Sequence, residues 1–271
     1  MASGIDLNRL LEISLSAGKE IMAVYGQELT VEAKADDSPL TIADQQSHRV
    51  IDAGLKSAYP EIPVLSEEGS EIPYEERKNW KRFWLVDPLD GTKEFIKQNG
   101  EFTVNIALIE GNYPVLGVIY VPATDVFYYG VENGGAYKLE EASAVKFENA
   151  ESLREKSIPL SAKKASGKIR VVTSRSHMSV ETQEFIERLA YEGQSIERVS
   201  AGSSLKFCLV AEGQADYYPR FAPTMEWDTA AGQAIVEAAG GIVQSAKEQS
   251  RFSYNQKSLT NGWFLAAGTD E

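Results

Sequence analysis

The chain has 271 residues, 43% hydrophobic and 25% charged, values typical of a globular protein with a sizeable core. Its net charge of −13 argues against binding a nucleic-acid polymer, which needs a basic surface, but does not exclude a small nucleotide. One cysteine excludes an intrachain disulfide and, with two histidines, a typical zinc site. No segment resembles a secretory signal or an integral membrane span. We therefore expect a cytoplasmic protein, with peripheral association at the inner membrane left open.

Two helices are predicted before the first chemical motif. Apolar residues recur with helical spacing from Ile5 to Tyr25, and Gly26 is a helix-stop residue. Thr41 and Asp44 then match a capping box ahead of a second helix over residues 45–59. Taken by itself, Asp44 is simply the capping acid of that helix.

The central motif is FWLVDPLDGT, residues 83–92. The apolar run 83–86 predicts a buried strand that ends at Asp87. Pro88 fixes its own φ and favours an extended residue before it, so the carboxylates of Asp87 and Asp90 should point at nearly one place. Two close negative charges repel each other, and a divalent cation such as Mg²⁺, which prefers carboxylate oxygens, would relieve that conflict.

The residues around Asp90 suit an anion beside that cation. The Leu89 carbonyl can serve as a third oxygen ligand, and Gly91 allows the backbone to approach a ligand closely. Thr92 begins a short predicted helix, TKEFIK, whose first amides attract phosphate. The alternative is an ordinary Asp/Gly turn after a core strand. Six consecutive residues suited to metal or phosphate binding disfavour it.

An antiparallel meander is predicted after the motif, because apolar strands are separated by short turns. We expect these strands over residues 101–110, 113–122, 126–130 and 135–139. The charged, pattern-poor segment 140–157 follows. It divides the chain into a predicted N-terminal α+β half, residues 1–145, and a C-terminal half, residues 146–271.

The C-terminal half alternates strands with helices, which predicts an α/β layer packed on the first half. The expected strands cover residues 169–174, 195–199, 215–220 and 263–268, and the expected helices cover 180–192, 201–213 and 227–241.

DPLDGT after an apolar strand resembles the signature of the Mg²⁺-dependent, lithium-sensitive phosphomonoesterases. That superfamily comprises inositol monophosphatases, fructose-1,6-bisphosphatases and 3'(2'),5'-bisphosphate nucleotidases. The longer string over residues 84–110 resembles the bacterial nucleotidase branch. The stretch WDTAAG, residues 227–232, precedes an apolar helix ending in Gly-Gly and matches the second signature of the superfamily. The resemblance implies an α/β fold, an α+β layered sandwich of alternating helix and sheet layers.

The resemblance also implies roles for acids that have simpler interpretations by themselves. Of two adjacent glutamates after a short strand, the first, Glu67, becomes a metal ligand rather than a solvated loop charge. Asp228 becomes another, rather than only an acid that favours a helix dipole. Asp44 and Thr92 would activate the attacking water. The implied ligand set for two or three Mg²⁺ ions is Glu67, Asp87, the Leu89 carbonyl, Asp90 and Asp228.

A bisphosphorylated nucleotide needs cations away from the metals to hold its second phosphate. Lys206 and Arg220 supply a point charge and a bidentate fork, and with Ser203 and His177 they resemble the nucleotidase branch. The amides of Gly91 and Thr92 and the side chain of Asp228 complete the implied substrate contacts. The simpler alternatives are a surface charge at Lys206, a helix cap at Ser203 or Ser204, and a loop residue at His177.

We therefore expect a Mg²⁺-dependent phosphoric monoester hydrolase that converts adenosine 3',5'-bisphosphate, a by-product of sulfate assimilation, to AMP and phosphate. One alternative is an inositol monophosphatase or a broader sugar-phosphate phosphatase with the same metal site. Another is a non-catalytic protein that uses the acids to hold Ca²⁺ or sense a nucleotide. The sequence leaves open the oligomeric state and the preference among adenosine 3',5'-bisphosphate, its 2',5' isomer and 3'-phosphoadenylyl sulfate.

Overall fold

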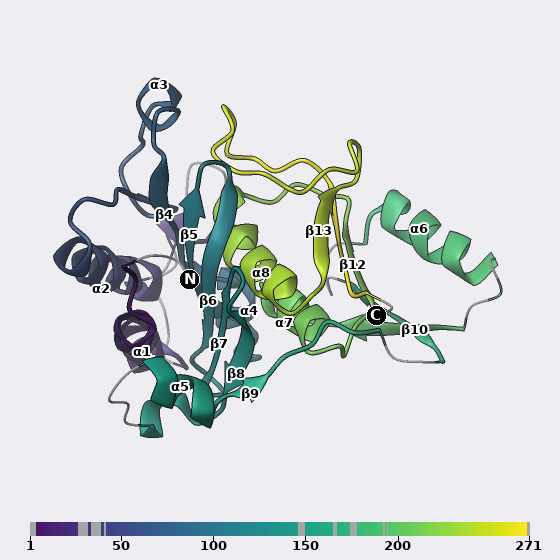
Figure 1. Ribbon diagram of the computed structural model, residues 1–271, viewed down its shortest axis with the longest axis horizontal. Helices are drawn as coiled ribbons and strands as arrows, with labels where there is room; N and C mark the ends of the chain where they lie inside the picture. The colour runs from purple at the N-terminus through teal and green to yellow at the C-terminus, as the bar shows by residue number, and fades with distance from the viewer. Residues whose placement is uncertain are drawn as a thin grey trace.

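Helices and sheets alternate in five layers, which lie side by side in Figure 1. The order is α1 (Leu7–Val24) with α2 (Ile42–Ala58), a seven-stranded sheet, α7 (Leu205–Ala211) with α8 (Glu226–Ala238), a five-stranded sheet, and α6 (Val180–Tyr191). This arrangement confirms the predicted layered α/β fold. The computed structural model describes residues 4–26, 32–33, 39–40, 42–145, 150–164, 167–173, 178–191, 193 and 195–269.

The seven-stranded sheet has the strand order β3-β4-β5-β6-β7-β8-β9. β3 runs parallel to β4, and each later pair is antiparallel, which confirms the predicted meander. The strands are β3 (Val64–Ser66), β4 (Arg82–Asp90), β5 (Thr103–Glu110), β6 (Tyr113–Val121), β7 (Val126–Val131), β8 (Gly135–Leu139) and β9 (Ile158–Pro159). The last strand comes from beyond residue 145, and the division of the chain into two halves there stays a prediction.

The five-stranded sheet has the order β11-β10-β12-β14-β13. Its strands are β10 (Ile169–Thr173), β11 (Ile196–Ser200), β12 (Tyr217–Arg220), β13 (Ile242–Ser245) and β14 (Phe264–Ala267). The sequence analysis did not include β13, which is short and pairs antiparallel with the predicted strand β14. It also did not include the short elements β1 (Glu32–Ala33), β2 (Pro39–Leu40), α3 (Tyr74–Arg77), the 3₁₀ helix Ala142–Ala144 and α5 (Ala150–Lys156).

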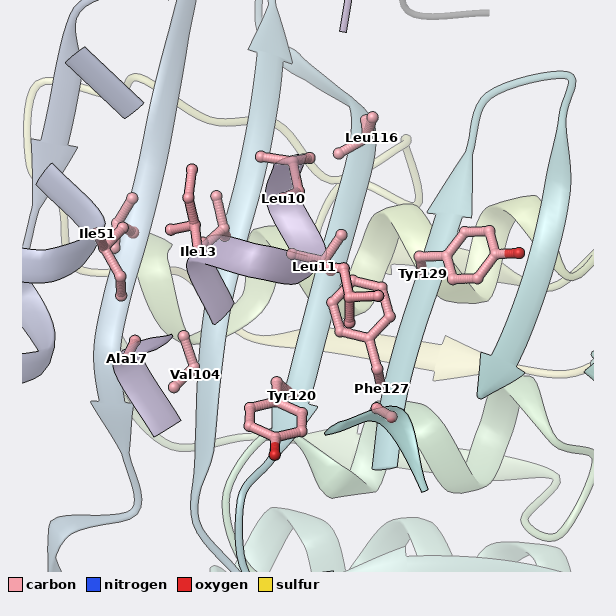
Figure 2. Close-up of a cluster of buried hydrophobic side chains, with 14 of the residues drawn as sticks. Leu10, Leu11, Ile13, Ala17, Ile51, Val104, Leu116, Tyr120, Phe127 and Tyr129 are labelled. Atoms are coloured by element: carbon pink, nitrogen blue, oxygen red, sulfur yellow. The ribbon is translucent and has the colours of Figure 1, made fainter. Parts of the chain in front are cut away.

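Two predicted N-terminal helices cover the outer face of the larger sheet. They are α1 (Leu7–Val24) and α2 (Ile42–Ala58), and the centres of their apolar stripes are buried. Figure 2 shows the resulting outer core: Leu10, Leu11, Ile13 and Ala17 from α1, Ile51 from α2, and Val104, Leu116, Tyr120, Phe127 and Tyr129 from the sheet. Burial of apolar surface, rather than helix propensity alone, holds these helices in place.

Two further helices, α7 (Leu205–Ala211) and α8 (Glu226–Ala238), fill the layer between the sheets. Glycines allow α8 to lie directly on the larger sheet. A Cβ atom at Gly117 would lie 2.4 Å from the Ala231 carbonyl oxygen, and one at Gly130 would lie 2.6 Å from Ile235 Cα. This close packing fixes α8 against β6 and β7 and so sets where its first turn lies.

The helix α6 (Val180–Tyr191) covers the outer face of the smaller sheet, as Figure 1 shows at the right. Val171, Phe185 and Ile186 form a small core there. Within the described part of the chain, no helix is both long enough and apolar enough to cross a bilayer.

Candidate active site

A β-bulge in β4 brings two predicted metal ligands to one face of the sheet. β4 does not end at Asp87, as the sequence analysis expected, but continues to Asp90. Asp87 pairs with Asn105 and Asp90 with Thr103, so three steps along β4 match two steps along β5. Side chains alternate along a strand, and the extra residue turns Asp90 to the same face as Asp87. Leu89 accordingly packs in the outer core.

Asp228, in the first turn of α8, completes a group of three acids with Asp87 and Asp90. One carboxylate oxygen from each lies within 4.8 Å of the others. The Met225 amide donates to Asp228 Oδ2 over 2.8 Å, so this acid also caps its helix. Asp228 is therefore the capping acid of its helix, and its role as a metal ligand stays a prediction. A set of converging carboxylates has the donor chemistry that Mg²⁺ prefers.

The electrostatics of the group also fit a cation. Burial raises the pKa of Asp87 well above its usual range, and the nearby charges of Glu67, Asp90, Asp228 and Asp44 raise it further. Burial likewise raises the pKa of Asp228 well above its usual range, with Asp90 as the next contributor. Buried like charges favour protonation unless a cation is present. The residues at this site therefore fit a divalent cation that would keep them ionised.

Glu67 lies beside the three acids at the end of β3. Its amide donates to the Val86 carbonyl over 3.1 Å, which holds it next to β4. Its charge raises the pKa values of both Asp87 and Asp228. It is not one of the three residues whose oxygens lie within 4.8 Å of one another. Its role as a metal ligand stays a prediction.

Asp44 and Thr92 approach the group from two helices. Asp44 lies in the first turn of α2 and is 1% exposed. Thr92 begins the predicted short helix α4 (Thr92–Ile96), and its hydroxyl donates to the Leu89 carbonyl over 3.4 Å. Gly91 precedes α4 with a φ of 89°, the left-handed region that glycine adopts without strain. The predicted activation of a water by Asp44 and Thr92 stays a prediction, and Thr41, the proposed capping partner, lies outside the described residues.

A cavity of about 130 Å³ opens beside the acids. Asp90 and Asp228 line it together with Ser203, Lys206 and Arg220, so the structure places these predicted substrate residues in one cavity. Arg220 ends β12, and its Nη2 donates to the Pro223 carbonyl over 3.1 Å. His177 lies outside the described residues, and its predicted contact stays a prediction.

Lys206 is an interior residue rather than a surface charge. It is 5% exposed, its Nζ donates to the Ser203 carbonyl, and it lies 5.5 Å from the centre of the Tyr218 ring. Burial lowers its pKa to about 8; nearby Arg220 lowers it as well, while Asp90 opposes the shift. A buried cation that lines a cavity is suited to bind a phosphate anion.

The two serines before α7 contact an acid instead of capping the helix. Ser204 occupies the N-cap position, but its side chain makes no capping hydrogen bond. The hydroxyls of Ser203 and Ser204 donate to Asp90 Oδ2 over 2.6 and 2.7 Å. The expectation of a serine helix cap was therefore wrong, because both hydroxyls are directed to the carboxylate of Asp90 and not to the amides of the first turn.

The chain matches the inositol monophosphatase family over residues 7–268. It belongs to this family. It is 51% identical over 239 residues to the 3'(2'),5'-bisphosphate nucleotidase CysQ of Salmonella typhimurium, an alignment that covers 88% of this chain and 89% of that one. The CysQ of Haemophilus influenzae is 36% identical over 266 residues, with 97% and 92% covered. The crystal structure of CysQ from Bacteroides thetaiotaomicron, a bacterial member of the inositol monophosphatase family, superposes with a TM-score of 0.87 at 45% identity, covering 97% of this chain and 98% of that one.

Membership of the inositol monophosphatase family confirms the recognition made from DPLDGT and WDTAAG. The sequence analysis missed Thr103 and Asn105, two buried polar residues on the face of β5 that meets the site. A signal was present, since polar residues alternate with apolar ones from Glu101 to Asn105 in an otherwise apolar strand.

Proposed function

We propose that this member of the inositol monophosphatase family is a Mg²⁺-dependent 3'(2'),5'-bisphosphate nucleotidase. It would hydrolyse adenosine 3',5'-bisphosphate to AMP and phosphate. The observation that carries the proposal is the cavity in which Lys206 and Arg220 stand beside Asp90 and Asp228. An acidic metal site next to two cations suits a substrate with two phosphates. The nucleotidase activity printed in the names of the CysQ relatives supports the same substrate class.

The proposed ligands for two or three Mg²⁺ ions are Glu67, Asp87, the Leu89 carbonyl, Asp90 and Asp228. When bound, the ions supply Lewis acidity that lowers the pKa of a water and stabilises the leaving alkoxide. The charge conflict that raises the pKa values of Asp87 and Asp228 supports this assignment.

The proposed catalytic residues are Asp44 and Thr92. Asp44 would accept the proton of the attacking water as a general base, and Thr92 would orient that water. The burial of Asp44 and its effect on the pKa of Asp87 support a place next to the reacting groups. The amides of Gly91 and Thr92 would hold the phosphate that is removed.

The second phosphate would be held by Lys206 and Arg220, away from the metals. Ser203, His177 and Asp228 would complete the contacts to the substrate. The proposal also includes inhibition by Li⁺, which the family resemblance implies, and a cytoplasmic location, which the single buried cysteine suits.

A phosphate-release panel tests the proposal. The substrates are adenosine 3',5'-bisphosphate, its 2',5' isomer, 3'-phosphoadenylyl sulfate and inositol 1-phosphate, each with and without Mg²⁺ and with added Li⁺. We expect Mg²⁺-dependent release that is fastest from the nucleotides. Faster hydrolysis of inositol 1-phosphate would overturn the substrate but keep the metal chemistry. No release from any compound would favour the non-catalytic binding protein.

A further inference from the structure

Three alternate residues of the β5 region contact three consecutive residues of the loop before α7. Glu101, Thr103 and Asn105 share one side of the chain, because side chains alternate and Phe102, Val104 and Ile106 pack in the outer core. The contacts are Gly202 N donating to Glu101 Oε2 over 2.7 Å, Thr103 Oγ1 with Ser203 Oγ at 2.7 Å, and Asn105 Nδ2 donating to Ser204 Oγ over 2.9 Å. We call this set the β5 ladder.

The inner part of the β5 ladder is buried and polar. Thr103, Asn105 and Ser204 are 0%, 1% and 2% exposed, and Thr103 Oγ1 lies 2.9 Å from Asn105 Oδ1. Farther along the same face of β5, Ala107 and Ile109 are apolar and pack in the inner core. Apolar side chains could therefore fill this face, and buried polar groups stabilise a fold only when all are well paired. The polar residues thus call for an explanation beyond packing.

The β5 ladder leads to one oxygen of Asp90. The hydroxyls of Ser203 and Ser204 both lie against Oδ2, at 2.6 and 2.7 Å. With Oδ2 held by two donors, Oδ1 is the oxygen available to a cation. Ser204 Oγ also lies 2.8 Å from the Asp228 carbonyl oxygen, so one hydroxyl touches the segments that carry two of the three clustered acids.

The loop that carries these hydroxyls has a strained backbone. Ser203 adopts a φ of 51°, which is uncommon for a residue other than glycine. Such a conformation persists when surrounding contacts enforce it. Here the contacts are those of the β5 ladder on one side and Asp90 on the other.

We propose that Thr103, Asn105 and Ser204 are positioning residues for the metal site. They hold Asp90 with one oxygen directed to the cation; Ser204 also lines the cavity, whereas Thr103 and Asn105 do not. Partners that orient a ligand in this way are worth roughly 10–100-fold in metal affinity. The inference rests on the metal role of Asp90 in the proposed function and is independent of the nucleotide substrate.

Titration of the full chain with Mn²⁺, with the heat of binding measured by calorimetry, tests the inference without relying on turnover. Thr103→Val removes a hydroxyl at nearly constant volume, and Thr103→Ser keeps it. Ser204→Ala removes one of the two hydroxyl donors to Asp90. The matched control is Ser157→Ala, since Ser157 is also a buried serine but donates to the Leu153 carbonyl.

We expect Thr103→Val and Ser204→Ala to weaken Mn²⁺ binding by about tenfold or more. Thr103→Ser and Ser157→Ala should bind as the wild type does. Unfolding temperatures of the metal-free variants should fall no further than that of Ser157→Ala. If Ser204→Ala does not fold, the comparison of Thr103→Val with Thr103→Ser tests the inference.

Wild-type Mn²⁺ affinity in both Thr103→Val and Ser204→Ala would overturn the inference and leave the proposed function intact. Equal weakening by Ser157→Ala would also overturn it, because the effect would then be general destabilisation. A wild-type chain that binds no Mn²⁺ would remove the metal role of Asp90 and, with it, the proposed function.

Discussion

Asp87 and Asp90 lie three residues apart in β4, yet their carboxylates converge on one face of the sheet. In a regular strand they would face opposite sides. The bulge between them adds one residue, and Pro88, which has no amide proton to donate, lies within it. The metal motif is therefore a local irregularity of the sheet, held by regular pairing on both sides.

Asp228→Asn should separate charge repulsion from metal binding. Because burial and Asp90 raise the pKa of Asp228, a neutral amide removes an unfavourable charge and keeps an oxygen for the Met225 amide. Without metal, we expect the variant to unfold at or above the unfolding temperature of the wild type. Mg²⁺ should raise the unfolding temperature of the wild type but not that of the variant. Thermal unfolding with and without Mg²⁺ measures both. A lower temperature without metal and an unchanged rise with Mg²⁺ would contradict the proposed role.

Asp44→Asn should reduce turnover by at least ~10²-fold and keep metal binding, as expected for loss of a general base. The measurement is kcat together with Mn²⁺ titration. Asp52→Asn is the control, since Asp52 lies on the same helix and pairs with Lys56 over 2.8 Å. Turnover at the wild-type level in Asp44→Asn would exclude Asp44 from the mechanism.

Arg220→Ala should discriminate between substrates. We expect the KM for adenosine 3',5'-bisphosphate to rise roughly 10–100-fold, the size of a charged hydrogen bond, and the KM for a simple monophosphate to change little. Arg198→Ala is the control, because Arg198 lies on β11 and donates to Gln183 over 3.1 Å. An equal rise for both substrates would show that Arg220 does not hold the second phosphate.

Gly117→Ala should displace α8 from the larger sheet. The new Cβ would lie 2.4 Å from the Ala231 carbonyl oxygen, and that oxygen belongs to the helix backbone and cannot rotate away. We expect the free energy of unfolding to fall by about 1–3 kcal/mol and Mg²⁺ affinity to fall with it, since α8 carries Asp228. Denaturant unfolding checks the first effect and metal titration the second. Gly262→Ala, where the Cβ meets nothing within 4 Å, should change neither.

Much of the fold could be predicted from periodicity. The spacing of apolar residues predicted α1, α2, α6, α8 and the meander β5 to β8, and the structure confirms them. The end of β4 was wrong because Pro88 and the Asp-Gly pair are local turn signals, whereas β5 supplies a partner that lets pairing resume at Asp90. The expectation that a serine caps α7 was wrong because the acceptor of both hydroxyls, Asp90, is more than one hundred residues away in the chain.

The sequence by itself determined the types and order of the longer elements, the family signatures and the acids that belong to the candidate site. Local residues set the backbone conformation and the apolar face of each element, so both can be predicted without knowing which distant residues the element contacts. Only the tertiary structure decided which side of β4 Asp90 faces, which hydroxyls hold it and that Lys206 is buried. Those features depend on register and on helix-to-sheet packing, in which residues remote in sequence become neighbours.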